Sequence, residues 1–189
     1  MNLLTDADGA FAVARARELV EAAVRRRPVA EIAYPAAFSE PRGVFVTLTE
    51  FGELRGCIGI PYPVMPLSEA LEDAAVSAAV RDPRFRPVDP AELADISLEV
   101  TVLTPPEALI CPPGERWQHV ETGRHGLMVK AGSRSGLLLP QVAAEYGWTP
   151  SEFLSQTCIK AGLPPSAWRE SSCSVFVFEG QIFESSDFS

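Results

Sequence analysis

Two short apolar runs with one glycine between them constrain this chain more than any other part of its sequence. Val44 to Thr49 is rich in β-branched and aromatic residues, and Leu54 to Ile60 is a second run of strand length. Gly52 lies between them, and glycine favours the tight turns that join antiparallel strands. The pattern predicts a β-hairpin, so at least part of the chain folds as an antiparallel sheet.

Helical patterns interrupt the strand patterns. Thr5 and Asp8 are spaced as a helix N-cap and an acidic third residue, and this helix is expected to stop before Pro28. Leu67 to Val80 has leucine and alanine at helical spacing and predicts a buried helix. Pro140 can open a short helix, and the run Thr149-Pro150-Ser151-Glu152 predicts a capping box at the start of another.

Further strands are expected at Ile96 to Leu103, Gly126 to Lys130 and Gly136 to Leu139. Ser174 to Glu179 and Gln181 to Phe183 predict a closing hairpin around Gly180. Hairpins with helices between them favour an α+β fold, with a mainly antiparallel sheet covered by helices and residues 1–189 forming one domain. The chain lacks a regular βαβ rhythm and the glycine-rich loops that bind phosphates, so a Rossmann or P-loop nucleotide site is not supported.

The charge balance bears on the class of ligand. The formal net charge is -9 and the isoelectric point is about 4.8. Nucleic-acid binding requires a surplus of Lys and Arg on some face, so nucleotide or RNA binding ranks last among the functions considered.

The same sequence predicts a cytoplasmic protein. Met1 to Glu21 lacks the basic and apolar regions of a signal peptide, and no apolar run approaches the roughly 18 residues of a membrane span. The four cysteines are widely spread without a CxxC pair and are read as reduced thiols. No Cys/His spacing matches a zinc ligand set, so a metal site is not expected, and the sequence names no cofactor.

The hexapeptide from Leu54 to Gly59 carries the strongest candidate site. Side chains on a strand alternate between two faces. One face is expected to carry Leu54, Gly56, Ile58 and Ile60 against the core, and the other to carry Arg55, Cys57 and Gly59. A cation near a cysteine stabilises the thiolate, which makes Cys57 a candidate nucleophile and Arg55 its partner. Free cysteines are also often buried as small hydrophobes, so a structural role for Cys57 stays open.

Four other residues complete the candidate site. Gly56 and Gly59 leave bare backbone where a ligand can approach. If Ile96 to Leu103 joins the same sheet, Glu99 can share a face with Cys57, where it can pair with Arg55 or act as a base towards the thiol or a bound substrate. A solvated strand face is the alternative for Glu99. Gln141 is a candidate polar contact at a helix start, or an ordinary first-turn residue.

At these residues the chain resembles a known family. A series of short blocks stands in the order seen in the AMMECR family: Gly43 to Leu48, Leu54 to Gly59, Pro66-Leu67, Asp82-Pro83-Arg84-Phe85, Glu99-Val100, Gly136 to Val142 and Lys160 to Pro164. The resemblance covers roughly Thr5 to Glu184. It implies an α+β fold with a larger sheet-containing part, a smaller lobe and a cleft near the hexapeptide, and it supports Arg55, Cys57, Glu99 and Gln141 as site candidates.

The resemblance implies no particular reaction, so two functions stay open ahead of nucleotide binding. The first is a thiol-dependent enzyme, or an enzyme subunit, that acts on a small molecule in a cleft at the hexapeptide. The second is a non-catalytic adaptor or ligand-binding module. Prokaryotic members of the family are often encoded beside, or fused to, a Memo-like protein, with a radical SAM protein nearby. The resemblance therefore implies these two proteins as partners in one pathway.

Overall fold

The computed structural model describes residues 3–185 and divides the chain into two compact units. Of the described residues, the first unit comprises 3–103 and 181–185, and the second comprises 104–180. Each unit has its own sheet, its own helices and its own hydrophobic core. The fold is α+β, as the sequence patterns predict.

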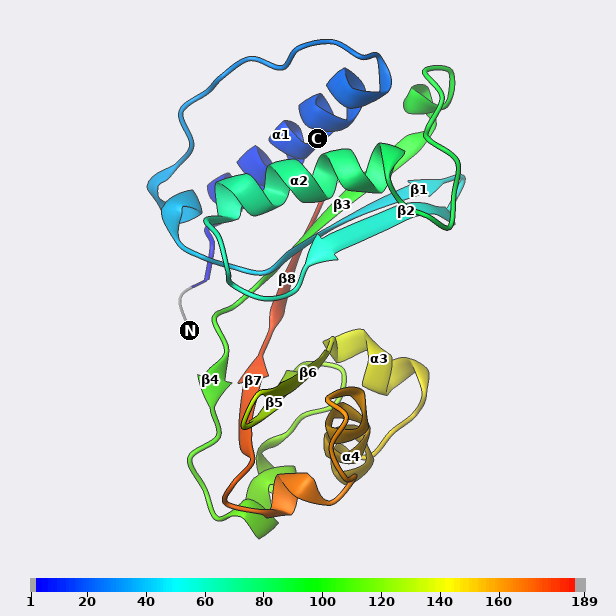
Figure 1. Ribbon diagram of the computed structural model, residues 1–189. Helices are drawn as coiled ribbons and strands as arrows, with labels where there is room; N and C mark the ends of the chain where they lie inside the picture. The colour runs from blue at the N-terminus through cyan, green and yellow to red at the C-terminus, as the bar shows by residue number, and fades with distance from the viewer. Residues whose placement is uncertain (1–2, 186–189) are drawn as a thin grey trace. The chain divides into compact units, whose positions relative to one another are not determined.

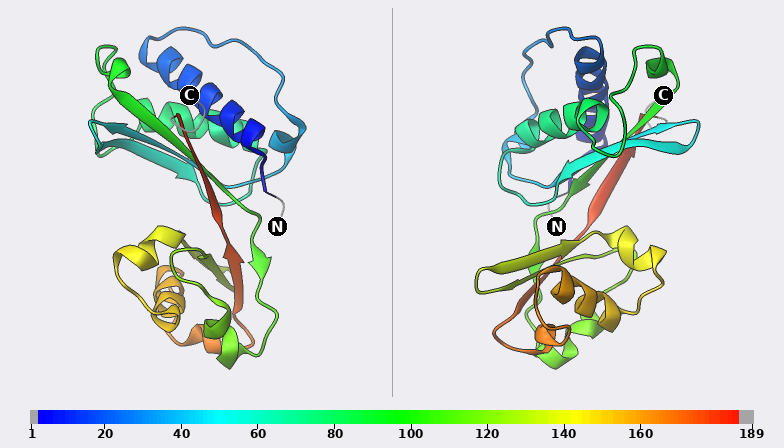
Figure 2. Two further views of the ribbon diagram at one scale, coloured as in Figure 1. Left: turned by 180° about the vertical axis from the view of Figure 1, so that it is seen from behind. Right: turned by 45° about the vertical axis from the view of Figure 1, so that its right-hand side comes forward.

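The first unit is a four-stranded sheet with two helices on one face, shown in Figure 1 and from two further directions in Figure 2. The strand order is β2-β1-β3-β8, so β2 is an edge strand. The strands are β1 (Val44–Glu50), β2 (Glu53–Ile60), β3 (Ile96–Leu103) and β8 (Gly180–Glu184). The helices are α1 (Asp6–Val24) and α2 (Leu67–Val80). Short 3-10 turns, η1 (Ala36–Ser39) and η2 (Glu92–Ala94), lie in the connections.

Local sequence rules account for these helices. Thr5 and Asp8 form the predicted capping box of α1, in which each side chain bonds the backbone of the other residue. The alanines of α2 are buried and let the helix lie close to the sheet. Opposite them, alternate residues of β1 and β3 are buried in the same core. The amphipathic strands therefore leave their other face, which we call the open face, away from α1 and α2.

A buried arginine ties the long connection after α1 to both helices. The Arg15 guanidinium donates to the Tyr34 hydroxyl at 3.0 Å and to Glu72 at 3.1 Å. Burial of Tyr34, together with its hydrogen bond to Glu72, raises the pKa of its phenol to about 12. This network holds residues 28–43 against α1 and α2, where the sequence predicts only an extended loop.

The predicted hairpin is present, but a β-bulge near the start of β2 changes the face of the sheet to which the first side chains of this strand point. Leu48 lies opposite Gly56 while Thr49 lies opposite Leu54, so Arg55 is an extra residue on β2. One extra residue reverses the alternation before it. Leu54, expected on the core face, instead shares the open face with Thr49 and is 44% exposed. The expectation for Leu54 was therefore wrong, whereas Gly56, Ile58 and Ile60 do face the core side.

The second unit has a sheet of order β4-β7-β5-β6. Its strands are β4 (Glu107–Ala108), β5 (Gly126–Ala131), β6 (Arg134–Leu138) and β7 (Ser174–Phe178). Its helices are α3 (Pro140–Glu145) and α4 (Pro150–Lys160), with 3-10 turns η3 (Pro113–His119) and η4 (Ala167–Arg169). The predicted capping box of Thr149 and Glu152 starts α4, and the buried Trp168 belongs to the core of this unit.

The predicted closing hairpin around Gly180 is wrong. β7 pairs with β4 and β5 in the second unit, whereas β8 joins the sheet of the first unit. Gly180 is not among the glycines with a left-handed backbone, so it does not reverse the chain. Two strand patterns that follow each other closely in sequence therefore need not form a hairpin. Here the first strand belongs to one sheet and the second strand to the other.

Candidate functional site: a row of side chains on the open face

Two candidate residues, Cys57 and Glu99, lie in one row across the open face with a threonine between them. Thr47, on the central strand β1, is directly opposite Cys57 of β2 and directly opposite Glu99 of β3. Residues that are opposite each other in an antiparallel pair point to the same face. The structure therefore brings Cys57 and Glu99 to one face, with Thr47 between them.

The thiol of Cys57 is half-buried and has a hydroxyl partner. The Thr47 hydroxyl donates to the Cys57 sulfur, with Oγ1 and Sγ 3.3 Å apart. The backbone N–H and C=O of Cys57 point away from β1, so these two residues form a non-hydrogen-bonded pair, the kind in which side chains come closest. The contact between sulfur and hydroxyl follows from this register.

Two side chains take the place of a neighbouring strand at the free edge of β2. The backbone N–H of Cys57 donates to Asp82 Oδ2 at 2.9 Å, and Arg84 Nη2 donates to the carbonyl of Cys57 at 2.9 Å. Asp82 and Arg84 also pair with each other at 2.7 Å. The Arg84 guanidinium holds the pKa of Asp82 well below its usual range, although burial acts in the other direction. The backbone of Cys57 is therefore clamped on the side that an edge strand leaves unpaired.

Arg55 is placed elsewhere than the sequence argument requires. Its Nε and Nη2 bond both oxygens of Glu92, at 3.0 and 2.9 Å. Nη1 and Nη2 also donate to the carbonyls of Arg86 and Pro87. The hydrogen bond from Arg55 lowers the pKa of Glu92, because it stabilises the charged carboxylate. Arg55 thus fastens residues 86–92 to β2, and among the described residues its guanidinium pairs with Glu92 and not with Glu99.

Arg84, and not Arg55, is the cation that contacts Cys57, through the backbone carbonyl of that residue. Its pKa is raised chiefly by the hydrogen bond to Asp82, and its attraction to Cys57 acts in the same direction. Sequence reasoning missed Asp82, Arg84 and Thr47 as site residues. Alternation signals only neighbours on one strand, whereas Asp82 follows the end of a helix and meets Cys57 across 25 positions of sequence.

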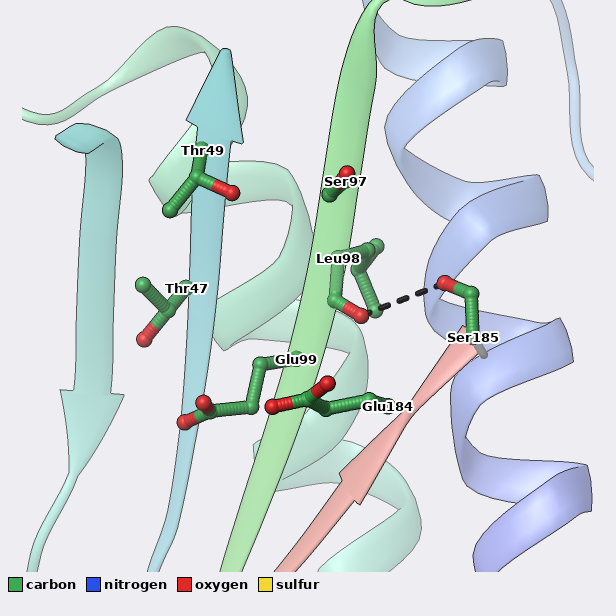
Figure 3. Close-up of a pocket in the computed structure, with 7 residues that line it drawn as sticks. All are labelled: Thr47, Thr49, Ser97, Leu98, Glu99, Glu184 and Ser185. Atoms are coloured by element: carbon green, nitrogen blue, oxygen red, sulfur yellow. Dashed lines mark hydrogen bonds between the residues drawn. The ribbon is translucent and has the colours of Figure 1, made fainter. Parts of the chain in front are cut away.

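A shallow pocket of about 230 Å³ lies beside the row, shown in Figure 3. Its lining is Thr47, Thr49, Ser97, Leu98, Glu99, Glu184 and Ser185. The Glu99 side chain extends from β3 over β1, and Glu184 of β8 points towards it. Thr101 donates to Glu99 Oε1 at 2.9 Å. The pocket therefore carries two carboxylates, and the side chains of Thr47, Thr49 and Ser97 add hydroxyl groups to its lining.

The two glycines of the hexapeptide are covered by the protein's own chain. A Cβ at Gly56 would lie 2.2 Å from the carbonyl oxygen of Ala78, so its lack of a side chain admits α2. A Cβ at Gly59 would lie 2.2 Å from the ring of Phe45, which packs over it. The role of Gly56 and Gly59 as ligand contacts stays a prediction.

The remaining candidate, Gln141, and two of the other cysteines belong to the second unit. Gln141 is an exposed residue in the first turn of α3, in the second unit. Cys158 and Cys173 are buried in the core of that unit, and burial raises the pKa of both thiols, that of Cys158 to about 11. In the part of the chain that the structure describes, no three His, Cys, Asp or Glu side chains gather as metal ligands would. No helix among these residues is long and apolar enough to cross a membrane.

The fold and the site define an α+β protein with two sheets, in which an edge strand carries a clamped cysteine. The AMMECR1 family model matches residues 13–183, and the chain belongs to this family. It is 49% identical to protein MJ0810 of Methanocaldococcus jannaschii, over 97% of this chain and 93% of that protein. A protein of Methanosarcina acetivorans is 51% identical, over 96% and 94%.

A solved structure supports the same assignment. The crystal structure of the uncharacterised protein PH0010 from Pyrococcus horikoshii matches with a TM-score of 0.79 and 45% identity. The match covers 96% of this chain and 93% of that one. The fold described above is therefore shared with a relative over nearly its full length.

Proposed function

We propose that this protein is a thiol-dependent enzyme, or a subunit of one, whose reacting group is the sulfur of Cys57. The observation that carries the proposal is the row of Cys57, Thr47 and Glu99 on the open face. A nucleophile, a hydroxyl donor and a carboxylate on neighbouring strands are the parts that a reaction at an electrophilic carbon needs.

Each side chain has a distinct part in such a reaction. The Thr47 hydroxyl donates to the sulfur and is placed to stabilise negative charge there. The Asp82–Arg84 clamp fixes the backbone of Cys57, so the thiol is held in one position before a substrate arrives. Rigid placement of this kind lowers the entropy cost of bringing nucleophile and substrate together.

Glu99 is best suited to act on the substrate and not on the thiol. Neighbouring strands lie about 4.8 Å apart, so the backbones of Cys57 and Glu99, two strands apart, are separated by roughly 10 Å. A small molecule that lies over Thr47 would span this distance. With the sulfur at one end, Glu99 can take or give a proton at the other.

Alkylation of the native protein tests the proposal, because the chain has internal controls. At pH 7 we expect iodoacetamide to modify Cys57 at least about fivefold faster than Cys111, which is also half-buried but lies in a proline-rich loop. Cys158 and Cys173 are expected to stay unmodified because they are buried. Mass spectrometry of the digested protein gives the rate at each cysteine.

Matched threonine variants test the hydroxyl contact. Thr47→Val is expected to slow the reaction of Cys57 about threefold or more, because one hydrogen bond to the sulfur is lost. Thr49→Val, on the same strand and face, should leave the rate unchanged. A parent Cys57 that reacts no faster than Cys111 would remove the basis for a thiol-dependent reaction.

A second candidate function, an adaptor without catalysis, is favoured by the turn that precedes the hexapeptide. Phe51 and Gly52 form the two-residue loop between β1 and β2, and both have positive φ, 51° and 83°. A bulky side chain rarely adopts this conformation, and Phe51 is 81% exposed. An exposed ring on a strained turn, three residues before the exposed Leu54, is suited to contact a protein partner, for which a Memo-like protein is the candidate.

Replacing Phe51 with asparagine separates binding from stability. Asn-Gly is the favoured sequence for a turn with two left-handed residues, so Phe51→Asn should raise the free energy of unfolding by about 0.5–1 kcal/mol. If the ring contacts a Memo-like partner, calorimetric titration should show affinity at least about tenfold weaker. An unchanged affinity, with the alkylation rate of Cys57 also unchanged, would exclude this turn from the interface.

A further inference from the structure

The hydrogen bonds of Arg84 leave one side of its guanidinium free. An arginine side chain has five N–H donors, one on Nε and two on each Nη. Nε donates to Asp82 Oδ1, and Nη2 donates to Asp82 Oδ2 and to the Cys57 carbonyl. Among the described residues, none accepts a hydrogen bond from Nη1. Two N–H groups therefore remain for another acceptor.

The Arg84 side chain is largely exposed, and it meets Cys57 at the backbone carbonyl of that residue. The side chain of Arg84 is 53% exposed, whereas that of Asp82 is 1% exposed. The ion pair thus has its negative end inside the protein and its positive end outside. Because Asp82 holds Nε and Nη2 together, the guanidinium keeps one orientation, and little entropy is lost when an acceptor binds to Nη1.

We infer that Arg84 determines substrate specificity by binding a carboxylate of the molecule that reacts at Cys57. The inference rests on the proposed function and adds the chemical class of the substrate. The two N–H groups of Nη1 diverge, so a carboxylate oxygen accepts from one of them and the charge of the guanidinium adds to the attraction, whereas a phosphate, with more charge and more acceptor oxygens, is typically held by several donors. In contrast, four of the five donors of Arg55 are occupied, two by Glu92 and two by backbone carbonyls.

The charged side chains of the open face determine which end of a substrate with a carboxylate lies near Cys57. Glu99 and Glu184 both line the pocket on the β3 and β8 side. Carboxylates repel an anionic group there, so the carboxylate of the substrate is directed to the β2 edge, where Arg84 meets Cys57. The opposite end of the substrate then lies near Glu99, and it carries a neutral or cationic hydrogen-bond donor.

Two alkylating reagents that differ in charge test this inference. Iodoacetate carries a carboxylate and iodoacetamide does not, while both form an S–C bond with the cysteine and release iodide, the thiol proton passing to the buffer. The ratio of their rates at Cys57, divided by the same ratio at Cys111, measures preference for an anion. We expect this quotient to be about three to ten in the parent protein and close to one in Arg84→Gln.

Two further variants keep the result interpretable. Arg84→Lys retains the charge without the fork and should keep part of the preference, even where Arg84→Gln lowers stability. Arg25→Gln, at the exposed end of α1, removes the same charge and should leave the quotient at the parent value. A quotient that stays within twofold of the parent in Arg84→Gln overturns the inference, while rapid reaction with iodoacetamide preserves the proposed function. A Cys57 that reacts no faster than Cys111 with iodoacetamide removes both.

Discussion

Replacing Gly56 with alanine is expected to lower the free energy of unfolding of the first unit by about 3 kcal/mol. The added Cβ would lie 2.2 Å from the carbonyl oxygen of Ala78 and 3.2 Å from its carbonyl carbon. These atoms belong to the backbone of the buried helix α2, so they cannot move aside as the end of a flexible side chain can. Overpacking of this kind typically costs about 1–3 kcal/mol, and a backbone neighbour places Gly56 at the upper end.

Unfolding followed by two probes measures the effect. Circular dichroism in the far ultraviolet reports mainly on α1 and α2. Tryptophan fluorescence reports on the second unit, because all three tryptophans, Trp117, Trp148 and Trp168, lie there. Gly56→Ala should shift the dichroism transition to lower denaturant concentration. The control is Gly114→Ala in η3, where no atom lies within 4 Å of the added Cβ, and stability should be unchanged or rise by up to about 1 kcal/mol. A Gly56→Ala variant as stable as the parent would show that α2 can retreat from β2.

The hairpin and the helices could be predicted because short-range rules determine them. Thr5 with Asp8, and Thr149 with Glu152, form capping boxes between residues three positions apart. The helix from Leu67 to Val80 has the predicted bounds because its periodicity and the following Asp82-Pro83 act locally. Interactions that span a few residues can be read from a pattern.

The errors arose where geometry depends on how strands pair with one another. The bulge at Arg55 depends on how β1 pairs with β2, and it placed Leu54 on the face opposite to the expected one. Likewise, β8 pairs in the first sheet although it directly follows β7, because its place is set by burial against α1 and β3 and not by a turn at Gly180. Strand alternation contains no information about either choice.

The candidate site shows the same division. Alternation predicts that Cys57 and Glu99 can share a face, and the register of β1 with both neighbours places them there. The partner of Arg55, however, is Glu92, which lies 37 positions away in sequence. Proximity of Arg55 to Cys57 along the strand could not reveal that a distant carboxylate binds the guanidinium more closely.

Replacing Asp82 with asparagine is expected to lower the free energy of unfolding by about 2–4 kcal/mol at pH 7. The Asp82 carboxylate accepts from the Cys57 N–H and from three donors of Arg84: its backbone N–H, Nε and Nη2. An asparagine has one acceptor oxygen, so its NH₂ group must face either the N–H of Cys57 or the guanidinium. A donor that faces another donor in a buried site loses the hydrogen bond and leaves polar groups unsatisfied.

The pH dependence of stability isolates the charge of Asp82. Its folded pKa is depressed chiefly by the hydrogen bond from Arg84, with an ordinary value of 3.8. A depressed pKa contributes stability that is present above the ordinary value and is lost as pH falls towards the folded value. The difference in melting temperature between the parent and Asp82→Asn should therefore be constant above about pH 5 and narrow steadily below about pH 4.

Asp95→Asn gives the matched control, because Asp95 is exposed next to η2 and the charge change is the same. It should differ from the parent by less than about 0.5 kcal/mol at pH 7. If the destabilisation in Asp82→Asn does not depend on pH between 5 and 2, the clamp acts through shape and not through charge. If, in addition, the alkylation rate of Cys57 is the same in Asp82→Asn as in the parent, the clamp protects the edge of β2 without positioning the thiol. A combined loss of acid-dependent stability and of Cys57 reactivity would instead tie the pairing of the strand edge directly to the chemistry on the open face.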